Sequence, residues 1–237
     1  METIDVIILA GGLGTRLREV VGNTPKVLAS VNNRPFLDIV LGYLDKWECV
    51  GKVVIAAGYM AERIITEYDR KNRYHFQIDF SVEKELLGTG GGIIKGLGFT
   101  TTDIVLALNG DSYINVDLTR LSATHNARKA AMTIVVRRVG DAGRYGSVKL
   151  DSYHKIISFH EKKSGQTDGY INAGVYLFRR RLFEAVDAGK VLSLERELLP
   201  YFLEKEEIYG YVSTGKFIDI GTPESYRIAD SYLKEMI

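Results

Sequence analysis

The stretch LAGGLGTRLREVVGNTPK, residues 9–26, decides the fold of this chain together with the apolar segment before it. Residues 4–9, IDVIIL, are β-branched and almost uncharged, which predicts a strand buried on both faces, as in a parallel sheet covered by helices. Gly11, Gly12 and Gly14 follow this strand and permit positive φ angles and a close approach of the backbone to an anion. The stretch therefore predicts a phosphate-binding loop behind a parallel strand.

Two cations complete this loop. The guanidinium of Arg16 has a fork of donors that suits phosphate oxygens, and Lys26, held after the rigid Pro25, would bring a point charge to the same place. A tight strand-to-helix turn with solvated cations would explain three glycines alone. The glycines and both cations together favour a phosphate site.

Two common glycine motifs do not fit. The dinucleotide fingerprint G-x-G-x-x-G needs a glycine where this chain has Leu17, and the P-loop needs one where it has Arg16. The pattern G-G-x-G-T-R-L, followed by Pro25-Lys26, instead resembles the signature of the sugar-1-phosphate nucleotidylyltransferases, the enzymes that make nucleotide sugars. The resemblance implies an α/β fold, namely a Rossmann-like three-layer α/β/α nucleotidyltransferase fold with a mixed, mainly parallel central sheet. It also implies nucleotide contacts from the loop, at Leu9, Ala10, Gly11, Gly12, Gly14, Thr15, Arg16 and Lys26.

Length and composition fit one enzyme domain. The 237 residues are 46% hydrophobic, enough for a sizeable core, and we expect a single domain over 1–237. Its nucleotide-binding half is expected at 1–130 and its sugar-phosphate-binding half at 131–237. The formal net charge of +1 comes from 31 basic and 30 acidic residues, and this balance argues against nucleic acid or an anionic membrane as a partner.

The remaining features of the composition exclude classes of protein rather than identify one. A single cysteine, Cys49, excludes an internal disulfide and is expected in the core, and the four histidines show no metal-ligand spacing. No apolar run approaches the ~20 residues that span a bilayer, and the chain opens into a strand rather than a signal peptide. We therefore expect a cytoplasmic protein whose partners are small-molecule substrates; homo-oligomerisation is left open.

Strands and helices alternate in the first half, which is typical of a parallel sheet with right-handed crossovers. The expected strands are 52–57, 76–82 and 104–108, and the expected helices are 35–47, 59–68 and 116–128.

A second glycine run, G-T-G-G-G at 88–92, precedes a short apolar helix expected to end at Leu97. Helix stability does not justify glycines this dense, because each costs about 1 kcal/mol against alanine in a helix interior. A flexible turn is the alternative to a ligand-binding backbone. In the resembled family the corresponding run faces the nucleobase and ribose, which implies nucleotide contacts from Gly88, Thr89 and Gly90.

Asn109-Gly110-Asp111 follows the buried strand 104–108. A carboxylate at this end of a parallel strand lies where open α/β sheets bind ligands. Asp111 could hold Mg²⁺, which takes one or two protein carboxylates and fills its shell with water and phosphate oxygens. The tripeptide alone fits a turn capping the helix 116–128 equally well, but its place after a hydrophobic strand favours a nucleotide and metal ligand.

The second half is richer in strands, expected at 132–139, 146–150, 155–161 and 170–178, in a mixed sheet. Asn172 inside an apolar strand implies a polar partner, because an unpaired buried amide costs about 1–3 kcal/mol. A sugar hydroxyl or a backbone carbonyl would satisfy it equally. The resemblance places Lys162 on the phosphate of the sugar, and implies sugar contacts from Gly146, Glu161 and Asn172.

In the last part we expect a helix over 193–204 with Ser193 as its N-cap, two paired strands at 208–213 and 216–220, and a terminal helix capped by Thr222. Asp219 lies between two isoleucines, where a buried carboxylate is costly unless it is paired or bound to a metal. In the resembled family the string D-x-G-T-P supplies the second metal ligand, and Asp219 matches it.

The reaction implied by the resemblance is attack of a sugar 1-phosphate oxygen on the α-phosphorus of a nucleoside triphosphate, with release of pyrophosphate. The attacking phosphate, with a second pKa near ~6, is already largely a dianion at neutral pH, so no general base is required. Catalysis then rests on positioning and charge stabilisation. The predicted catalytic residues are Arg16 and Lys26 on the triphosphate, Lys162 on the sugar phosphate, and Asp111 with Asp219 on Mg²⁺.

The strings V-I-I-L-A-G-G-L-G-T-R-L at 6–17, N-x-R-P-F-L-D at 32–38 and L-L-G-T-G-G-G-I at 86–93 are similar to those of D-glycero-α-D-manno-heptose 1-phosphate guanylyltransferases of bacterial surface-polysaccharide pathways. They imply GTP and a manno-configured heptose 1-phosphate as substrates and GDP-heptose as product. Mannose 1-phosphate guanylyl transfer and uridylyl, cytidylyl or thymidylyl transfer to another hexose 1-phosphate are alternatives. A metal-dependent glycosyltransferase and a non-catalytic nucleotide-sugar sensor are alternatives of a different class.

Overall fold

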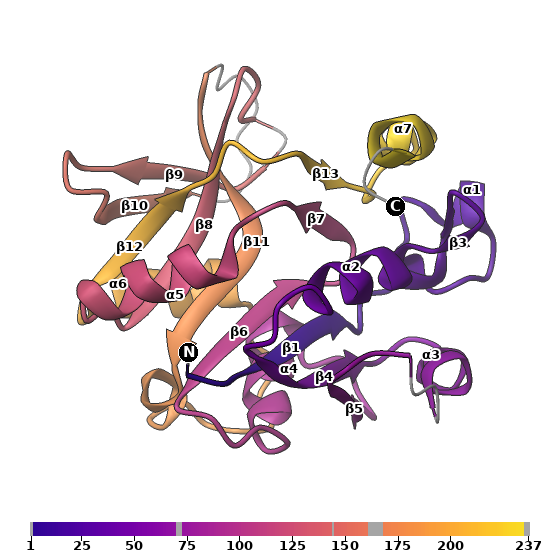
Figure 1. Cartoon of the computed structure of the whole chain (residues 1–237), viewed down its shortest axis with the longest axis horizontal. Coiled ribbons are helices and arrows are strands. Elements are labelled where there is room, and N and C mark those ends of the chain that lie inside the picture. Colours follow the sequence, from indigo (N-terminus) through magenta and orange to yellow (C-terminus); the bar gives the residue numbers. More distant parts are fainter. Residues whose placement is uncertain (1, 70–72, 144, 161–167, 235–237) are drawn as a thin grey trace.

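The computed structural model describes residues 2–69, 73–143, 145–160 and 168–234 (Figure 1). The strands are β1 Ile4–Ala10, β2 Ser30–Val31, β3 Arg34–Pro35, β4 Val50–Ala57, β5 Gln77–Val82, β6 Ile104–Asn109, β7 Ser112–Ile114, β8 Met132–Val139, β9 Ser147–Leu150, β10 Ile156–His160, β11 Gly169–Arg179, β12 Ile208–Val212 and β13 Phe217–Asp219. The α-helices are α1 Arg18–Val21, α2 Phe36–Leu44, α3 Ala61–Tyr68, α4 Gly88–Leu97, α5 Leu118–Ala127, α6 Leu199–Leu203 and α7 Pro223–Leu233. Three short helical turns are η1 Lys26–Leu28, η2 Arg180–Phe183 and η3 Leu194–Leu198.

Nine of the described strands form one mixed sheet. The strands β5, β4, β1 and β6 lie side by side and are all parallel, as the alternation of strands and helices in the first half predicts. The long strand β11 pairs antiparallel with β9 near its start and with β6 near its end, and β8 pairs antiparallel with it along the opposite edge. It therefore carries one continuous hydrogen-bonded sheet from the first half into the second (Figure 1).

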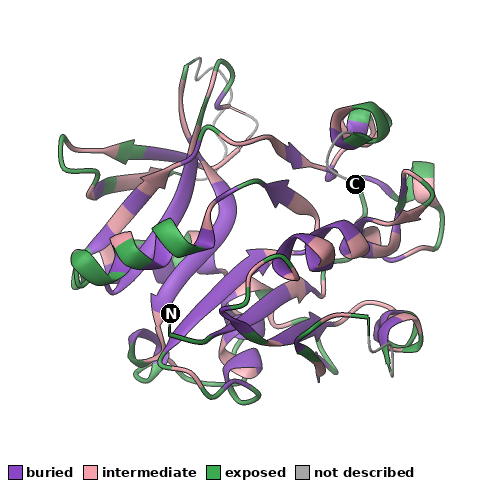
Figure 2. Cartoon of the chain, viewed as in Figure 1, coloured by how far each residue is buried: buried purple, intermediate pink, exposed green. Residues whose placement is uncertain are grey.

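Side-chain alternation along the central strands builds a core on each face of the sheet. On β1 the even-numbered apolar residues Ile4, Val6 and Ile8 belong to one buried cluster, with α2, α3 and α7, whereas Ile7 belongs to the other, with α4 and α6. In Figure 2 the central strands are buried, and the exposed residues gather on the helices and loops around them. The three-layer α/β/α architecture predicted from the sequence is confirmed.

Several local predictions are confirmed by the capping contacts. The Thr222 hydroxyl accepts a hydrogen bond from the backbone N–H of Ser225, and Pro223 begins α7, as expected for an N-cap followed by proline. Ser193 accepts from the N–H of Arg196, although the turn that it begins is a π-helix that continues into α6. Cys49 is a buried free thiol.

Two predictions about strands and helices are wrong. The segments 208–213 and 216–220 do not pair with each other: β12 lies parallel to β8, whereas β13 lies antiparallel to the three-residue strand β7. The glycine run at 88–92 does not precede a helix but forms the first half of α4. Close packing explains why glycines stand in this helix, since a Cβ on Gly91 would lie 2.8 Å from the carbonyl oxygen of Lys190.

Candidate active site

The glycine loop after β1 lies at the carboxyl edge of the parallel strands. Gly14 has a φ of +59°, so the chain needs glycine there to turn toward α1. The N–H of Gly110, at the end of β6, donates to the carbonyl of Leu9 at 2.9 Å, and the N–H of Tyr59 donates to the carbonyl of Gly11 at 3.3 Å. Loops following three neighbouring strands are thereby tied together, as the rule for ligand sites in open α/β sheets predicts.

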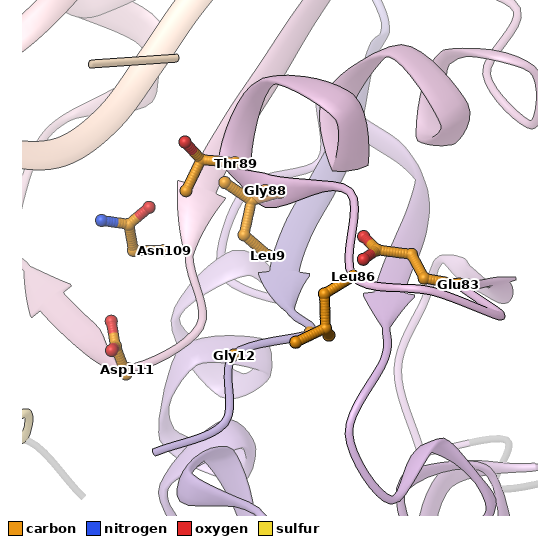
Figure 3. Close-up of a pocket in the computed structure, with 9 residues that line it drawn as sticks. Leu9, Gly12, Glu83, Leu86, Gly88, Thr89, Asn109 and Asp111 are labelled. Atoms are coloured by element: carbon orange, nitrogen blue, oxygen red, sulfur yellow. The ribbon is translucent and has the colours of Figure 1, made fainter. Parts of the chain in front are cut away.

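A first cavity of about 270 Å³ opens between these loops and the start of α4 (Figure 3). Glu83 and Asp111 lie on opposite sides of it in Figure 3. Its lining residues are Leu9, Gly11, Gly12, Glu83, Leu86, Gly88, Thr89, Asn109 and Asp111. Six of the residues that we predicted to contact the nucleotide therefore surround one cavity, namely Leu9, Gly11, Gly12, Gly88, Thr89 and Asp111.

A second cavity of about 360 Å³ adjoins the first, because both are lined by Gly12, Leu86 and Asp111. The other lining residues of this second cavity are Leu13, Gly14, Thr15, Arg16, Lys26 and Gly221. The two predicted cations thus line one cavity, while the first cavity holds the apolar surface of Leu9 and Leu86. The pair of cavities suits a nucleotide with its base in the first and its phosphates toward the second.

Two of the predicted nucleotide contacts line neither cavity. Ala10 is 6% exposed and belongs to the core on the α2 face of the sheet. Gly90 is buried within α4, where an added Cβ would lie 2.7 Å from a methyl group of Leu198. The Cα hydrogen of Gly90 that a side chain would replace points toward η3 rather than toward the cavity.

The short β7–β13 ladder brings the two predicted metal ligands together. Asp219 lies opposite Ser112, the neighbour of Asp111, and the N–H of Ile220 donates to the carbonyl of Asp111 at 2.9 Å. Gly221 leaves room for this meeting, because a Cβ there would lie 2.5 Å from Asp219 Oδ1. Two residues 108 positions apart in sequence, 219 minus 111, are therefore backbone neighbours; Asp111 lines both cavities, whereas Asp219 lines neither, although Gly221, two residues on, lines the second.

Lys26 contributes its charge to the same place. Its Nζ donates to Oδ2 of Asp111 in a short ion pair whose side chains are 13% and 31% exposed, and it would lie 2.9 Å from a Cβ on Gly221. Arg16, in contrast, is exposed and makes no ion pair with any described residue. Its guanidinium is free to meet an anion in the second cavity.

The alternative in which Asp111 caps a helix is contradicted by the structure. The N-cap of α5 is Asp117, whose carboxylate accepts a hydrogen bond from the N–H of Arg120 at 3.0 Å. Asp111 lies before β7 and faces the cavities instead.

Glu83, which the sequence analysis did not single out, is the acidic residue on the far side of the first cavity. It follows β5 directly, is 9% exposed, and accepts the N–H of Leu87 at 3.0 Å through Oε2. Burial raises the pKa of its carboxyl, and the hydrogen bond from Leu87 opposes this rise. The signal that identified Asp111, a carboxylate at the end of a predicted strand, would also have found Glu83.

Asn109 was also missed as a lining residue. Its side-chain oxygen is buried and accepts no hydrogen bond from the described residues, although it lies at the carboxyl end of β6 beside the first cavity. An orphaned buried amide oxygen is costly, so it marks a place where a ligand donor would fit.

The sugar-side predictions lie on the second half. The carbonyl of Gly146 accepts the N–H of Asn172 at 2.8 Å, which places these two residues together where β9 meets β11. The amide nitrogen of Asn172 donates to the hydroxyl of Tyr176 at 2.7 Å, so its polar partner is a phenol rather than the backbone carbonyl considered above. Glu161 and Lys162 lie outside the residues that the structure describes.

The residue set fits Mg²⁺. The hard carboxylate of Asp111 lines a cavity that Arg16 and Lys26 also line, the β7–β13 ladder holds Asp219 next to it in the fold, and Mg²⁺ is typically held by one or two carboxylates and substrate phosphate oxygens. Within the described ranges no group of three or more His, Cys, Asp or Glu side chains could hold a metal by itself.

Comparison with known proteins decides the family. The sequence model of the family described as nucleotidyl transferase matches residues 5–235. The chain belongs to the nucleotidyl transferase family. The predicted family and enzyme class are thereby confirmed. None of the helices in the described part of this nucleotidyl transferase has the length and apolar character needed to cross a bilayer.

Two relatives match this nucleotidyl transferase over almost their whole length. A D-glycero-α-D-manno-heptose 1-phosphate guanylyltransferase of Aneurinibacillus thermoaerophilus is 38% identical over 235 residues, covering 99% of this chain and 100% of the relative. One of Campylobacter jejuni is 35% identical, covering 94% and 97%. A mannose-1-phosphate guanylyltransferase of Mycobacterium tuberculosis is 32% identical, covering 94% of this chain and 62% of the relative.

Solved structures give the same picture. HddC from Yersinia pseudotuberculosis is 33% identical with a TM-score of 0.86, covering 97% of this chain and 99% of that one, and it has also been solved in complex with GMP-PN. The predicted fold class, with its mixed central sheet, is that of these nucleotidyltransferases.

Proposed function

We propose that this nucleotidyl transferase transfers the guanylyl group of GTP to D-glycero-α-D-manno-heptose 1-phosphate, which releases pyrophosphate and forms GDP-heptose. Support comes from the two relatives of matching length, both of which bear this name, and from HddC, which was solved with a guanine nucleotide analogue. The sequence strings at 6–17, 32–38 and 86–93 favour the same reaction.

The choice of guanine rests on one observation in the chain itself, the buried carboxylate of Glu83 beside the first cavity. An ionised carboxylate only accepts hydrogen bonds, through two oxygens. The Watson–Crick edge of guanine offers two neighbouring donors, the ring N1–H and the 2-amino group, which match those oxygens. Uracil and thymine present one donor between two carbonyl oxygens, and adenine and cytosine one amino donor beside a ring acceptor, so each would turn a lone pair toward Glu83.

The phosphates would then extend toward the second cavity, because Glu83 and Asp111 lie on opposite sides of the first one (Figure 3). Arg16 and the backbone of the glycine loop would bind the departing pyrophosphate, and Lys26 would exchange its contact with Asp111 for one with the nucleotide. The attacking phosphate needs no general base. The chain's contribution is thus to hold two anions in line and to offset their repulsion.

Mg²⁺ is the metal that this donor set fits, and we propose that Asp111 and Asp219 would hold it. The ion would supply neutralisation of the charge on the reacting phosphates. The contact of Lys26 with Asp111 shows that this carboxylate already attracts a cation. Lys162, by the resemblance, would bind the phosphate of the sugar.

A screen of pyrophosphate release with four nucleoside triphosphates against heptose, mannose and glucose 1-phosphates tests this function. We expect GTP with the manno-configured heptose 1-phosphate to give the highest kcat/KM. Mannose 1-phosphate lacks the seventh carbon and its hydroxyl, and a site built to hydrogen-bond that hydroxyl would be left unpaired. A better rate with UTP or CTP would contradict the assignment of the base, and a better rate with glucose 1-phosphate that of the sugar.

Mannose 1-phosphate is the second candidate substrate, favoured by the relative from Mycobacterium tuberculosis. The same screen separates the two, because the candidates differ only in the sugar.

A further inference from the structure

Glu195, on the π-helical turn η3, lies between the nucleotide pocket and the sugar-side strand β11. Its Oε2 accepts the hydroxyl of Thr89 at 2.6 Å, and its Oε1 accepts the hydroxyl of Tyr176 at 3.0 Å. Thr89 lines the first cavity from α4. Tyr176 lies on β11, four residues from Asn172. One carboxylate therefore bonds to both halves of the chain.

The hydrogen bonds that run from Glu195 through Tyr176 to Asn172, the sugar arm, have a fixed donor and acceptor at each step. Tyr176 is fully buried, and burial followed by the charge of Glu195 raises the pKa of its phenol well above the usual value, so it stays protonated and donates to Glu195. Its oxygen is then the acceptor for the Asn172 amide nitrogen at 2.7 Å. The Asn172 oxygen accepts the N–H of Gly174 at 2.9 Å, where the backbone has a φ of +74°. The orientation of the Asn172 amide is thus set from Glu195.

The hydrogen bond between Glu195 and Thr89, the nucleotide arm, is also fixed in its direction. The Thr89 oxygen accepts the N–H of Leu194 at 2.8 Å while its proton goes to Glu195. This hydroxyl has no proton left for a nucleotide, so Thr89 reaches the cavity with its methyl group and backbone. The turn of α4 that carries Gly88 is held further by the N–H of Gly90, which donates to the carbonyl of Leu192 at 2.8 Å.

We propose that Glu195 is a positioning residue of the transfer reaction, which sets the nucleotide loop at Gly88–Thr89 and the sugar-side amide of Asn172 relative to each other. A polar chain of this kind is stable only while every member is satisfied, and apolar side chains of similar shape would pack these positions as well. Its two ends are residues that the sequence analysis had assigned to the two different substrates. The proposal rests on the proposed function for the identity of those substrates.

The experiment compares steady-state constants and thermal midpoints for three variants. Each variant changes a different member of the hydrogen-bonded series Thr89–Glu195–Tyr176–Asn172. Thr89→Val removes the nucleotide arm and should raise the KM for the nucleotide. Tyr176→Phe removes the sugar arm and should raise the KM for the sugar 1-phosphate. Glu195→Gln keeps the shape but cannot accept both hydroxyls, so both KM values should rise and kcat/KM should fall about tenfold or more.

Glu197→Gln is the matched control. Glu197 lies on the same turn and accepts the backbone N–H of Ser193, whose hydroxyl donates to Glu195 Oε2 at 3.2 Å, but Glu197 has no hydrogen bond to Thr89, Glu195, Tyr176 or Asn172. Its variant should leave both KM values unchanged. A Glu195→Gln protein with a lowered thermal midpoint and unchanged KM values would show a purely structural role and overturn the proposal. Equal changes of the KM values in Glu195→Gln and Glu197→Gln would overturn it too.

If Glu195→Gln does not fold, a double-mutant cycle decides. Thr89 and Tyr176 are coupled only through Glu195 in our proposal, so the double variant should deviate from the product of the single effects on kcat/KM by about threefold or more. Independent effects would overturn it. The assays use the nucleotide and the sugar 1-phosphate that the wild type turns over best. A wild type that is inactive with every such pair would refute the proposed function. In that case the coupling is measured from the affinities for GTP and for sugar 1-phosphate in binding titrations.

Discussion

Glu83 differs from the neighbouring acidic side chains in being buried and in receiving a backbone N–H. Glu85, two residues on, is exposed, whereas Glu83 lies at the inner wall of the first cavity. Buried carboxylates that are not paired with a cation are uncommon, because desolvation penalises the charge. A ligand with two donors would satisfy it, which is why the choice of base is assigned to this side chain.

Glu83→Gln should weaken the use of GTP and relatively favour UTP or dTTP. The glutamine amide offers one acceptor and one donor, which no longer matches two guanine donors but does match a pyrimidine N3–H beside a carbonyl. We expect kcat/KM for GTP to fall by about 10- to 100-fold, the loss typical of a hydrogen bond to a charged group. Glu85→Gln is the control. An unchanged preference for GTP in Glu83→Gln would remove this residue from base recognition.

His125 makes the stability of the fold depend on pH. It is fully buried, its Nδ1 lies 2.9 Å from the hydroxyl of Thr133, and burial, with a smaller effect of Arg179, lowers its pKa to about 4. The unfolded chain has a histidine pKa of about 6.5 and binds the proton first as the pH falls, so the contribution is present above pH ~6.5 and is lost toward pH ~4.

Between pH 7 and pH 5 this histidine should remove roughly 2 kcal/mol from the free energy of unfolding. Urea unfolding at the two pH values measures it. His125→Gln should flatten the dependence, whereas His160→Gln, at an exposed position, should leave it unchanged. Equal slopes in the wild type and His125→Gln would contradict the assignment.

The β7–β13 ladder is short, with three residue pairs, but it determines where the carboxylates meet. Its hydrogen bond from Ile220 to the carbonyl of Asp111 fixes the backbone on both sides of the proposed metal site. The ladder itself needs neither carboxylate, since its hydrogen bonds join backbone groups.

Asp111→Asn and Asp219→Asn should therefore abolish most turnover and keep the fold. We expect kcat to fall by about two orders of magnitude or more in each, with little change in the circular-dichroism spectrum. Asp187→Asn, which alters an exposed ion pair with Lys190, is the control for a change of charge alone. Near-normal rates at saturating Mg²⁺ would remove the altered residue from the mechanism.

Helix α4 carries Gly92 and Gly96 one turn apart on the same face, and their substitution separates packing from binding. A Cβ on Gly92 would lie 2.8 Å from Oε1 of Glu83, whereas one on Gly96 would lie 3.0 Å from a methyl group of Ile7 in the core. Gly92→Ala should displace the Glu83 carboxylate and raise the KM for GTP by about tenfold. Gly96→Ala should leave that KM unchanged, so comparable KM values for the two variants would argue against a role of Glu83.

The two halves of the chain share one sheet and two cores. Strand β11 bonds to β6 of the first half and to β8 and β9 of the second, and the buried clusters on both faces contain residues from both halves. Separating the halves would expose apolar surface on each. The chain should therefore unfold as one unit, as expected for the single predicted domain.

Thermal unfolding should show one transition, with the same midpoint in far-UV circular dichroism and in the fluorescence of Trp47. Trp47 is the single tryptophan, follows α2 in the first half and packs against one of the two buried clusters, whereas circular dichroism reports on all helices and strands. GTP should raise the whole transition, because a ligand that binds the folded state stabilises all that unfolds with it. Two separate midpoints would contradict the single domain.

Much of this molecule was predictable from the sequence because the signals are local. The buried strand 4–9, the glycines with Arg16 and Lys26, and the Thr222-Pro223 cap each depend on residues within one or two turns of chain, where backbone preferences and spacing act directly. The family signature added the reaction and the pairing of Asp111 with Asp219.

What only the tertiary structure decided are the contacts between distant segments. Strand β13 pairs with β7 rather than β12, the glycines of α4 are packing positions, and Glu83 and Glu195 have partners that no local pattern reveals. These outcomes depend on which elements become neighbours when the sheet forms. A polar side chain gains its role from the donors, charges and solvent that the fold brings to it, and sequence spacing does not encode those distances.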